Sequence, residues 1–331
     1  MKVGLLGAGR IGALHSRLLS EHPDVEQVLV GDVDPAAAER VAGSVGAAAG
    51  QIDAVIGGAD AAVITAATSA HATLIGLCLD AGLPTFCEKP IALGLEETVE
   101  VVERCERDRA TLQIGFQRRF DPGFAEARRL VESGELGILY TLRLATHDPE
   151  PPHEEYVAHS GGIFRDLHIH DFDALRWMSC REAREVYAAG SVLEFEMFAR
   201  HGDFDTSAAL VTMEDGVLAV LTGGRRDPLG YDVRAELFGS GDSVAVGLDS
   251  RTPMRSLEPG AEDLLHGDRH AHFTARFEHA YRAELWHFLD LARGRAENPC
   301  TARDALEALR IALAADRSLA EHRPVALDEI G

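Results

Sequence analysis

The sequence predicts an α/β protein of two domains, the first with a parallel sheet and the second an α+β domain with an open, largely antiparallel sheet. Strand and helix patterns alternate over the first ~115 residues, as in parallel α/β sheets. Beyond them, strand patterns follow one another across short turns, as in antiparallel sheets. The chain has 331 residues, a length that suits two domains. We place these domains at residues 1–118 and 119–331.

In the first domain, short apolar runs predict strands and helical periodicity predicts helices. Strands are expected at residues 2–6, 27–31, 61–65, 85–88 and 111–116, with a further short apolar run at 54–56. Helices are expected at residues 11–20, 35–45, 70–81 and 95–108. Gly82 and Pro84 close the third of these helices, since neither residue favours a continued helix.

In the second domain, a helix at 122–133 ends before Gly134, and alternating strands follow. These strands are expected at residues 138–145, 185–191, 207–212, 217–222, 231–238 and 243–246. Turn signals at Asp215-Gly216 and at 239–242 join neighbours, and helices at 280–293 and 301–321 close the chain. Two irregular segments, 147–162 and 249–272, are of a length that is usually functional or mobile.

The charge balance excludes several classes of partner. Lys and Arg number 32 and Asp and Glu 54, so the net charge is −22, which disfavours nucleic acid and anionic membrane surfaces. No apolar run approaches the ~18 residues of a membrane-spanning helix, and the N-terminal apolar patch is too short for a signal peptide. Five cysteines without a CxxC pair fit free thiols in a reducing compartment. We therefore expect a cytoplasmic protein.

The residues Gly7-Ala8-Gly9-Arg10-Ile11-Gly12 form a GxGxxG motif between the first strand and the first helix. Gly7 permits a tight turn, Gly9 lets a pyrophosphate approach the backbone, and Gly12 lets helix and strand pack closely. The helix N-terminus supplies N–H donors and positive potential. In this context the motif predicts a Rossmann dinucleotide-binding domain; the alternative is a glycine-rich turn without a ligand.

Asp32 stands 20 positions after Gly12, at the end of the second strand. A carboxylate there accepts hydrogen bonds from the adenosine ribose hydroxyls and repels a 2′-phosphate. Residues 33–39 offer no Arg or Lys to bind such a phosphate. The predicted cofactor is therefore NAD rather than NADP.

Lys89 lies in the triplet Glu88-Lys89-Pro90, directly after a strand of the same domain. Ligands of open α/β sheets bind outside the carboxyl ends of the strands, so Lys89 is expected beside the nicotinamide. Lys2 and Lys89 are the two lysines of the chain, whereas arginine supplies the other basic residues. A lysine kept amid this preference for arginine favours a chemical role over a solvated surface position.

Asp166 and His170 belong to the segment 161–171, which leads into an apolar-periodic helix. If Asp166 lies in the first helical turn, the two side chains are i, i+4 neighbours. A carboxylate on one ring nitrogen fixes the tautomer, and the other nitrogen can take a hydroxyl proton. His168 points off this face, and we expect it to pack or to meet solvent.

Two histidine groups raise the question of a metal. The HxH of residues 168–170 has no Cys or Glu partner at a metal-ligand spacing. His266, His270 and His272 lie in a long charged segment, where a solvated or interface role is expected. No metal is predicted at either place.

The GxGxxG turn, the Glu88-Lys89-Pro90 triplet and the Asp166 and His170 pair together resemble the glucose–fructose oxidoreductase/inositol dehydrogenase (Gfo/Idh/MocA) family. Within it the chain is most similar to the inositol 2-dehydrogenase branch, on the stretches 115–124, 146–177 and 230–244 and the C-terminal run RFEHAYRAELWHFLD…RPVAL. The resemblance covers essentially the whole chain.

The resemblance implies NAD-dependent oxidation of a cyclic polyol, myo-inositol being the best match, by a homotetramer built by packing of sheet faces. It implies Lys89, Asp166 and His170 as the catalytic set: His170 accepts the proton, Asp166 orients it, and Lys89 donates to the reacting oxygen. The Lys89–Pro90 peptide would often be cis. The cofactor-binding residues would be Gly7, Gly9, Arg10, Ile11, Gly12, Asp32, Ala66, Thr68, His71, Glu88, Lys89 and Gln117. The polyol would contact Lys89, Arg119, His147, Asp166, His170, Asp173 and Tyr231.

The chain departs from the family pattern in two places. Residues 66–71 lack the Pro and the first Thr of the usual TPxxxH stretch, and Asp148-Pro149 follows His147 where some inositol enzymes carry Arg-Asn. These departures leave open scyllo-inositol, an aminocyclitol or an aldose as the substrate. A non-catalytic, NAD-sensing regulatory protein is the alternative of another class, although such a protein needs no base and orienter.

Overall fold

The computed structural model describes residues 1–254, 257 and 268–331. The chain divides into two compact units. The first unit holds Met1–Phe120 and His279–Glu307, and the second holds Asp121–Glu278 and Ala308–Gly331. The first unit thus contains a C-terminal segment that a single boundary after residue 118 assigns to the second.

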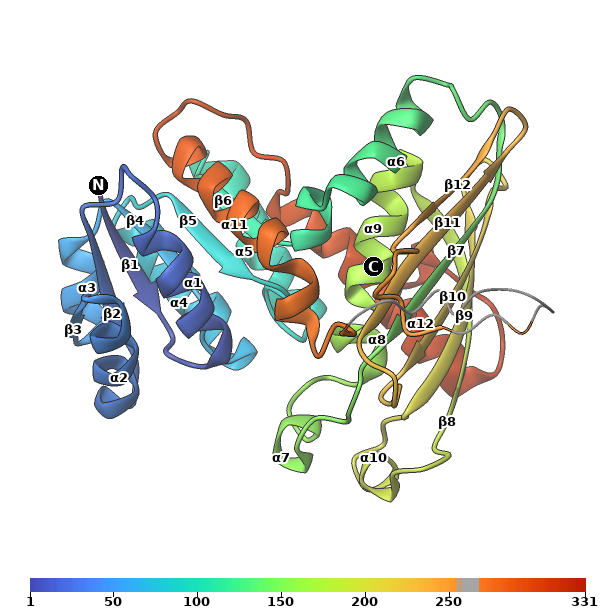
Figure 1. Cartoon of the computed structure of the whole chain (residues 1–331), viewed down its shortest axis with the longest axis horizontal. Helices are drawn as coiled ribbons and strands as arrows, with labels where there is room; N and C mark the ends of the chain where they lie inside the picture. Colours follow the sequence, from blue (N-terminus) through green and yellow to red (C-terminus); the bar gives the residue numbers. More distant parts are fainter. Residues whose placement is uncertain (255–256, 258–267) are drawn as a thin grey trace. The chain divides into compact units, whose positions relative to one another are not determined.

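A six-stranded parallel sheet in the order β3-β2-β1-β4-β5-β6 forms the centre of the first unit (Figure 1). Its helices connect successive strands, as parallel pairing requires. The strands are β1 Lys2–Leu6, β2 Gln27–Gly31, β3 Ala48–Gly50, β4 Ala61–Ile64, β5 Thr85–Glu88 and β6 Leu112–Gly115. The helices are α1 Arg10–Ser20, α2 Pro35–Val45, α3 Ile52–Gly58, α4 Thr68–Asp80 and α5 Leu95–Asp108, and a 3₁₀ turn, η1, covers Gln117–Phe120.

The strand order reverses at β1, which pairs with β2 on one side and β4 on the other. A ligand crevice is expected at such a reversal, beyond the carboxyl ends of the strands. The glycine-rich turn after β1 and residues 65–67 after β4 both lie at that edge. Two features of this sheet differ from the sequence prediction: the apolar run at 54–56 lies in helix α3, and the short strand β3 had not been expected.

The second unit contains a seven-stranded mixed sheet in the order β12-β11-β7-β10-β9-β8-β13. Strands β7 and β10 are parallel and the other pairs antiparallel. The strands are β7 Leu139–His147, β8 Ala183–Ser191, β9 Thr206–Met213, β10 Leu218–Gly224, β11 Asp232–Gly239, β12 Ser243–Val246 and β13 Val325–Ala326. The shorter helices are α6 Pro122–Glu132, α7 Glu154–Val157, α8 Ile163–Asp166, α9 Ile169–Ser179 and α10 Glu196–Arg200. Helices α7 and α10 and strand β13 had not been predicted.

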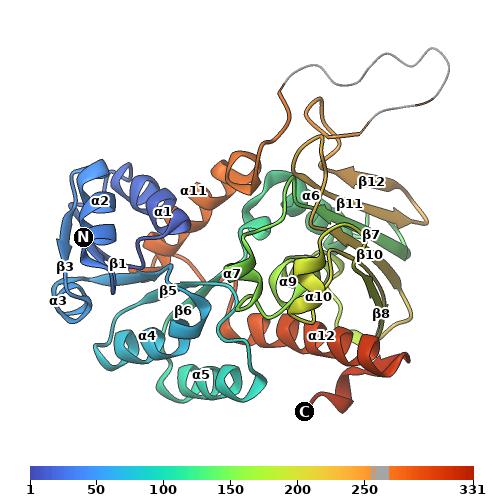
Figure 2. The ribbon, with the colours of Figure 1, turned by 90° about the horizontal axis from the view of Figure 1, so that it is seen from below.

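Helices cover one face of this sheet, and the other face presents apolar side chains outward. Both views show α6 and α9 on the same side of the strands (Figures 1 and 2). Burial alternates along β9 and β10, as expected for a sheet covered on one face. Leu210 and Val220, which pair across these strands, are 41% and 44% exposed. Asp215 and Gly216 form the turn between them, as predicted.

Two long helices, α11 Phe273–Ala292 and α12 Ala302–Glu321, contribute residues to both units. Helix α11 begins before the predicted residue 280 and has a kink at Phe277. Within the first unit, the Trp286 indole N–H bonds the carbonyl of Leu18, and the Ile114 N–H bonds that of Cys300. Segment 279–307 therefore packs against α1 and the outer edge of β6. A 3₁₀ turn, η2 Leu327–Glu329, follows β13.

Candidate active site

The glycine-rich turn has room for a ligand on one side and none on the other. Gly7 has a φ of +112°, and a Cβ there would lie 2.4 Å from the Ala66 nitrogen. A Cβ on Gly12 would lie 2.0 Å from the Gly7 carbonyl oxygen, so helix α1 needs a glycine at this contact. A Cβ on Gly9 would meet nothing within 4 Å, which leaves its backbone open to a ligand. Gly9 precedes α1, and no side chain caps that helix start.

Asp32 lies beside this turn. Its Oδ2 accepts a hydrogen bond from the Ala8 N–H at 2.6 Å, and its Oδ1 accepts one from the Asp34 N–H at 2.8 Å. A carboxylate fixed next to uncapped helix N–H groups matches an adenosine ribose with its pyrophosphate. The residues present therefore fit NAD, with Gly7, Gly9, Gly12 and Asp32 as its cradle. Arg10 and Ile11, also expected here, form the first turn of α1.

The His71 side chain, predicted to bind the cofactor, contacts the backbone next to Lys89. The His71 Nδ1 lies 2.7 Å from the Pro90 carbonyl oxygen and its Nε2 lies 3.0 Å from that of Ala66. The ring thus joins the segment after β4 to the cis Lys89–Pro90 peptide. Burial lowers the pKa of His71, which favours the neutral ring. Thr68 begins α4, and Gln117, at the start of η1, is buried.

Glu88, the residue before Lys89, contacts a histidine that the sequence analysis did not single out. Its Oε1 lies 2.7 Å from the Nε2 of His15, a buried residue of α1. The His15 ring also packs against Phe86 and Tyr281. Since His15 follows the glycine-rich turn on α1, this contact ties the turn to the end of β5, where Lys89 follows.

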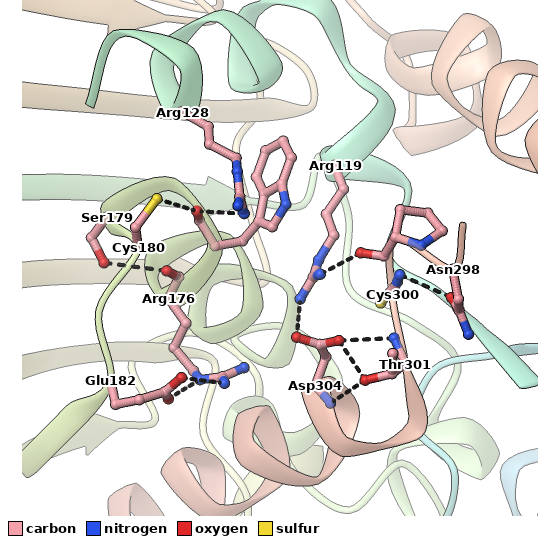
Figure 3. Close-up of polar contacts among 12 residues, drawn as sticks. Arg119, Arg128, Arg176, Ser179, Cys180, Glu182, Asn298, Cys300, Thr301 and Asp304 are labelled. Atoms are coloured by element: carbon pink, nitrogen blue, oxygen red, sulfur yellow. Dashed lines mark hydrogen bonds and ion pairs between the residues drawn. The ribbon is translucent and has the colours of Figure 1, made fainter. Parts of the chain in front are cut away.

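Arg119, predicted to contact the polyol, is buried in the first unit. Its Nη1 donates to the Pro299 carbonyl at 2.7 Å, and its Nη2 lies 3.1 Å from the Asp304 Oδ1 (Figure 3). Burial acts to raise the pKa of Asp304, but Arg119 and the hydrogen bonds from Thr301 hold it below its usual value. These contacts join η1 to the start of α12.

In the second unit, Asp166 and His170 lie on successive short helices. Asp166 ends α8, and His170 is the second residue of α9. Leu167 and His168 between them keep right-handed helical backbone angles. The Asp166 Oδ1 accepts a hydrogen bond from the Tyr156 hydroxyl at 2.7 Å, and its Oδ2 lies 2.9 Å from the Arg225 Nη2. The pairing of Asp166 with His170 stays a prediction.

His168 belongs to a buried network that the sequence analysis did not foresee. Its Nδ1 lies 2.8 Å from the Asp171 Oδ2, and its Nε2 lies 2.8 Å from the Ser207 hydroxyl. The other Asp171 oxygen accepts a hydrogen bond from the Thr146 hydroxyl at 2.7 Å. His168 therefore packs inside, one of the two outcomes expected for it. Thr146 precedes His147 and Asp171 follows His170, so the network joins the backbone beside two predicted site residues.

The other predicted polyol contacts also lie in the second unit. His147 ends β7, and burial lowers its pKa. Asp173 is fully buried on α9. Tyr231, just before β11, is buried, and Phe273 and Phe277 meet its ring at steep angles.

Among the residues that the structure describes, no group of three His, Cys, Asp or Glu could hold a metal ion. Likewise, no helix in the described part of the chain is long and apolar enough to cross a membrane. His266 lies outside the described residues. His270 is buried, and its Nε2 lies 3.9 Å from the Asp249 carboxylate.

The sheet order, the glycine-rich turn and Asp32 define an NAD-binding oxidoreductase of the Rossmann type. Residues 1–116 match the oxidoreductase family with an NAD-binding Rossmann fold, and residues 124–245 match the GFO/IDH/MocA C-terminal domain. The chain belongs to the GFO/IDH/MocA family.

Several proteins similar to this chain are named inositol dehydrogenases. It is 42% identical to the myo-inositol dehydrogenase Hyg17 of Streptomyces leeuwenhoekii, over 96% of this chain and 97% of that one. The crystal structure of a myo-inositol dehydrogenase from Corynebacterium glutamicum has a TM-score of 0.90 and 34% identity, covering 99% and 98% of the two chains. A scyllo-inositol dehydrogenase from Lactobacillus casei, solved with NAD(H) and scyllo-inositol, has a TM-score of 0.88 and 26% identity, covering 99% of each chain.

These findings confirm the predicted family, fold class and cofactor. The chain is an NAD-dependent oxidoreductase that acts on CH–OH groups and is similar to inositol 2-dehydrogenases.

Proposed function

We propose that the protein oxidises myo-inositol at C2 to 2-keto-myo-inositol. The observation that carries this proposal is the full-length similarity of the chain to myo-inositol dehydrogenases. The resemblance in sequence motifs assigns Lys89, Asp166 and His170 as the catalytic set. NAD, when bound, supplies the acceptor for the hydride that leaves C2. The residues of this chain have to bind the polyol and accept the hydroxyl proton.

In the proposed mechanism, the second ring nitrogen of His170 takes that proton as the C–H bond breaks. Asp166 orients His170 and stabilises the imidazolium that forms. Lys89 donates a hydrogen bond to the reacting oxygen, which becomes the carbonyl oxygen. One hydroxyl proton and one hydride leave the alcohol, so the ketone forms without a further co-reactant.

We propose His147, Asp173, Tyr231 and Arg119 as further polyol contacts. Arg119 already binds Asp304 and Pro299, so its substitution would mix folding with binding. His147 and Asp173 are the sharper test of polyol recognition. Removing a buried polar partner of a substrate hydroxyl raises KM for that substrate, and a deoxy analogue that lacks that hydroxyl is then affected less.

A different polyol is the second candidate, because Asp148 follows His147 where some relatives carry Arg. Asp148 pairs with Arg225 at 3.2 Å, so a carboxylate replaces a cation next to a proposed polyol contact. This departure keeps scyllo-inositol, an aminocyclitol or an aldose as alternative substrates. The NAD-sensing regulator stays an alternative that predicts cofactor binding without turnover.

A homotetramer is proposed as the working assembly. The outward face of the seven-stranded sheet supports it, since large apolar side chains stand there at 40–54% exposure: Tyr140, Tyr187, Leu210, Leu218 and Val220. Apolar groups gathered on one face favour packing against a second copy. Light scattering of the purified protein measures the assembly directly.

The decisive experiment follows NADH absorbance with NAD or NADP and a panel of myo-, scyllo- and D-chiro-inositol, glucose and xylose. Turnover on myo-inositol with NAD supports the proposal. A higher kcat/KM on another sugar would instead identify that sugar as the preferred substrate. Lys89→Met should lower kcat by more than about tenfold, or roughly 1.4 kcal/mol of barrier. NAD binding with no turnover across the panel favours the regulator.

A further inference from the structure

Arg225 follows β10 directly and is buried among three carboxylates of the second unit. Its guanidinium is 4% exposed. Nη2 lies 2.9 Å from the Asp166 Oδ2, and Nη1 lies 3.2 Å from the Asp148 Oδ2. The Arg225 backbone N–H bonds the Asp205 carbonyl at 2.8 Å, which anchors the residue at the sheet edge.

We propose that Arg225 is a positioning residue for the reaction: it holds Asp166 ionised and fixed in the orientation that His170 requires. This inference rests on the proposed function. It assigns a role to a residue that lies far from Asp166 in the sequence and has no part in the motif of residues 161–171.

The second Asp166 oxygen is fixed independently. The Tyr156 hydroxyl, from α7, donates to Oδ1 at 2.7 Å. Desolvation and the neighbouring Asp166 charge raise the pKa of Tyr156, which keeps its hydroxyl a proton donor. A carboxylate held by one donor on each oxygen cannot rotate about its Cβ–Cγ bond without losing both contacts. Tyr156 and Arg225 therefore define the Asp166 orientation from two different elements.

The carboxylates around Arg225 keep its side chain positively charged despite its burial. Burial acts to lower the Arg225 pKa, but Asp166, Asp148 and Asp203 outweigh it and raise the pKa, so the cation persists. Burial also raises the pKa of Asp203, whose Oδ1 accepts the N–H of Ile163 at the start of α8.

Another ion pair involves α8 and α12. Asp316 on α12 pairs with Arg165 at 3.0 Å, and burial raises the Asp316 pKa to about 6. Without Arg225, Asp166 would face Asp148 and Asp203 with no guanidinium between them. A carboxylate in that position takes up a proton more readily.

Arginine fits this place better than lysine because its planar fork reaches two carboxylates at once. Arg225→Lys keeps the charge and can contact one of the two. Arg225→Gln removes the charge and leaves a shorter, polar side chain. Comparing the two variants separates the effect of the positive charge on Asp166 from the effect of the forked guanidinium geometry.

The test measures kcat, KM and the pH profile of kcat/KM for wild type, Arg225→Gln and Arg225→Lys on the polyol of highest turnover. We expect Arg225→Gln to lower kcat by at least about tenfold and to move the acid limb of the profile up by roughly one pH unit or more. KM for NAD should stay within about twofold, because the NAD cradle is built from the first unit. Arg225→Lys should restore most of the acid-limb shift.

Arg176→Gln is the matched control. Arg176 is also a buried arginine of the second unit, and its fork binds Glu182 at 2.6 and 2.8 Å (Figure 3). Its loss should lower the melting temperature to a similar degree and leave the acid limb in place. If Arg225→Gln loses activity only in proportion to folded protein, or if Arg176→Gln moves the acid limb equally, the inference is wrong.

A readout without turnover separates this inference from the proposed function. In [¹³C]Asp-labelled protein, the Asp166 carboxyl signal is identified through Asp166→Asn. Its titration midpoint should rise in Arg225→Gln even if no polyol of the panel is oxidised. A wild type that oxidises none of the panel overturns the proposed function, whereas an unmoved midpoint overturns the role of Arg225.

Discussion

The His168 ring lies against the backbone of Gly223, so closely that a Cβ on Gly223 would lie 2.4 Å from the His168 Nε2. The ring is held there by Asp171 and Ser207 and stacks on Phe164. It cannot withdraw without breaking those contacts. The absence of a side chain at residue 223 is thus a condition for the buried network beside His170.

We predict that Gly223→Ala destabilises the protein by about 1–3 kcal/mol, since overpacking a fixed core displaces rigid neighbours. Urea unfolding measures the loss. Gly43→Ala is the matched control, because a Cβ there meets nothing within 4 Å in the helix α2. That change should stabilise by roughly 0.5–1 kcal/mol, and equal effects of the two substitutions would contradict the packing argument.

Asp32→Ala should weaken NAD binding by about tenfold, because the adenosine ribose hydroxyls lose their hydrogen-bond acceptor. It should also reduce the preference for NAD over NADP, because the charge that repels a 2′-phosphate is removed. Steady-state KM values for both cofactors measure the change. Asp34→Ala provides the comparison. Asp34 caps α2 through the Ala36 N–H at 3.0 Å, so its loss should cost about 1 kcal/mol of stability and leave the cofactor ratio unchanged.

His170→Asn should lower kcat by roughly 10²–10⁴-fold, the usual contribution of a general base. The NAD dissociation constant, measured by quenching of tryptophan fluorescence, should stay near the wild-type value because the glycine turn and Asp32 belong to the other unit. A His170→Asn variant that turns over at the wild-type rate would remove His170 from the mechanism.

Stability should fall as the solution becomes acidic. Burial lowers the pKa of His71 and of His147 in the folded protein, whereas in the unfolded chain both titrate near ~6.5. Below that pH the unfolded state binds more protons than the folded state, so the free energy of unfolding decreases. Melting temperatures between about pH 7.5 and pH 5.5 should decline more steeply for wild type than for His71→Gln. Equal slopes of melting temperature against pH for the two proteins would show that burial of His71 does not suppress its protonation.

The parallel sheet could be predicted because buried strands are continuous apolar runs between helical patterns. In β4, Ala61–Ile64, all four residues are buried. The same reasoning failed at Val55 and Ile56, which are the buried residues of the short helix α3. A run of two or three apolar residues does not distinguish a strand from one face of a helical turn. Strand β3 is built from Ala and Gly and has no apolar signal at all.

The candidate site was predictable where its parts are neighbours in sequence. The glycine turn, the Glu88-Lys89-Pro90 triplet and Asp32 each directly follow a strand that positions them. The hydrogen bond from Ala8 to Asp32 was not predicted. Arg225 and Tyr156 could not be found in this way. Arg225 contacts Asp166 from the residue after β10 and Tyr156 contacts it from α7. The sequence does not show which separate elements meet around one carboxylate.

The first unit cannot be completed early in synthesis of the chain. In its outer strand, β6, the Ile114 N–H donates a hydrogen bond to the Cys300 carbonyl. In its first helix, α1, the Leu18 carbonyl accepts a hydrogen bond from the Trp286 indole N–H. Both partners are translated after the whole seven-stranded sheet except β13. A nascent chain that ends near residue 120 therefore exposes the edge of β6 and one side of α1. The NAD-binding unit is thus the first to begin synthesis, yet its core is completed only after most of the second unit has been made.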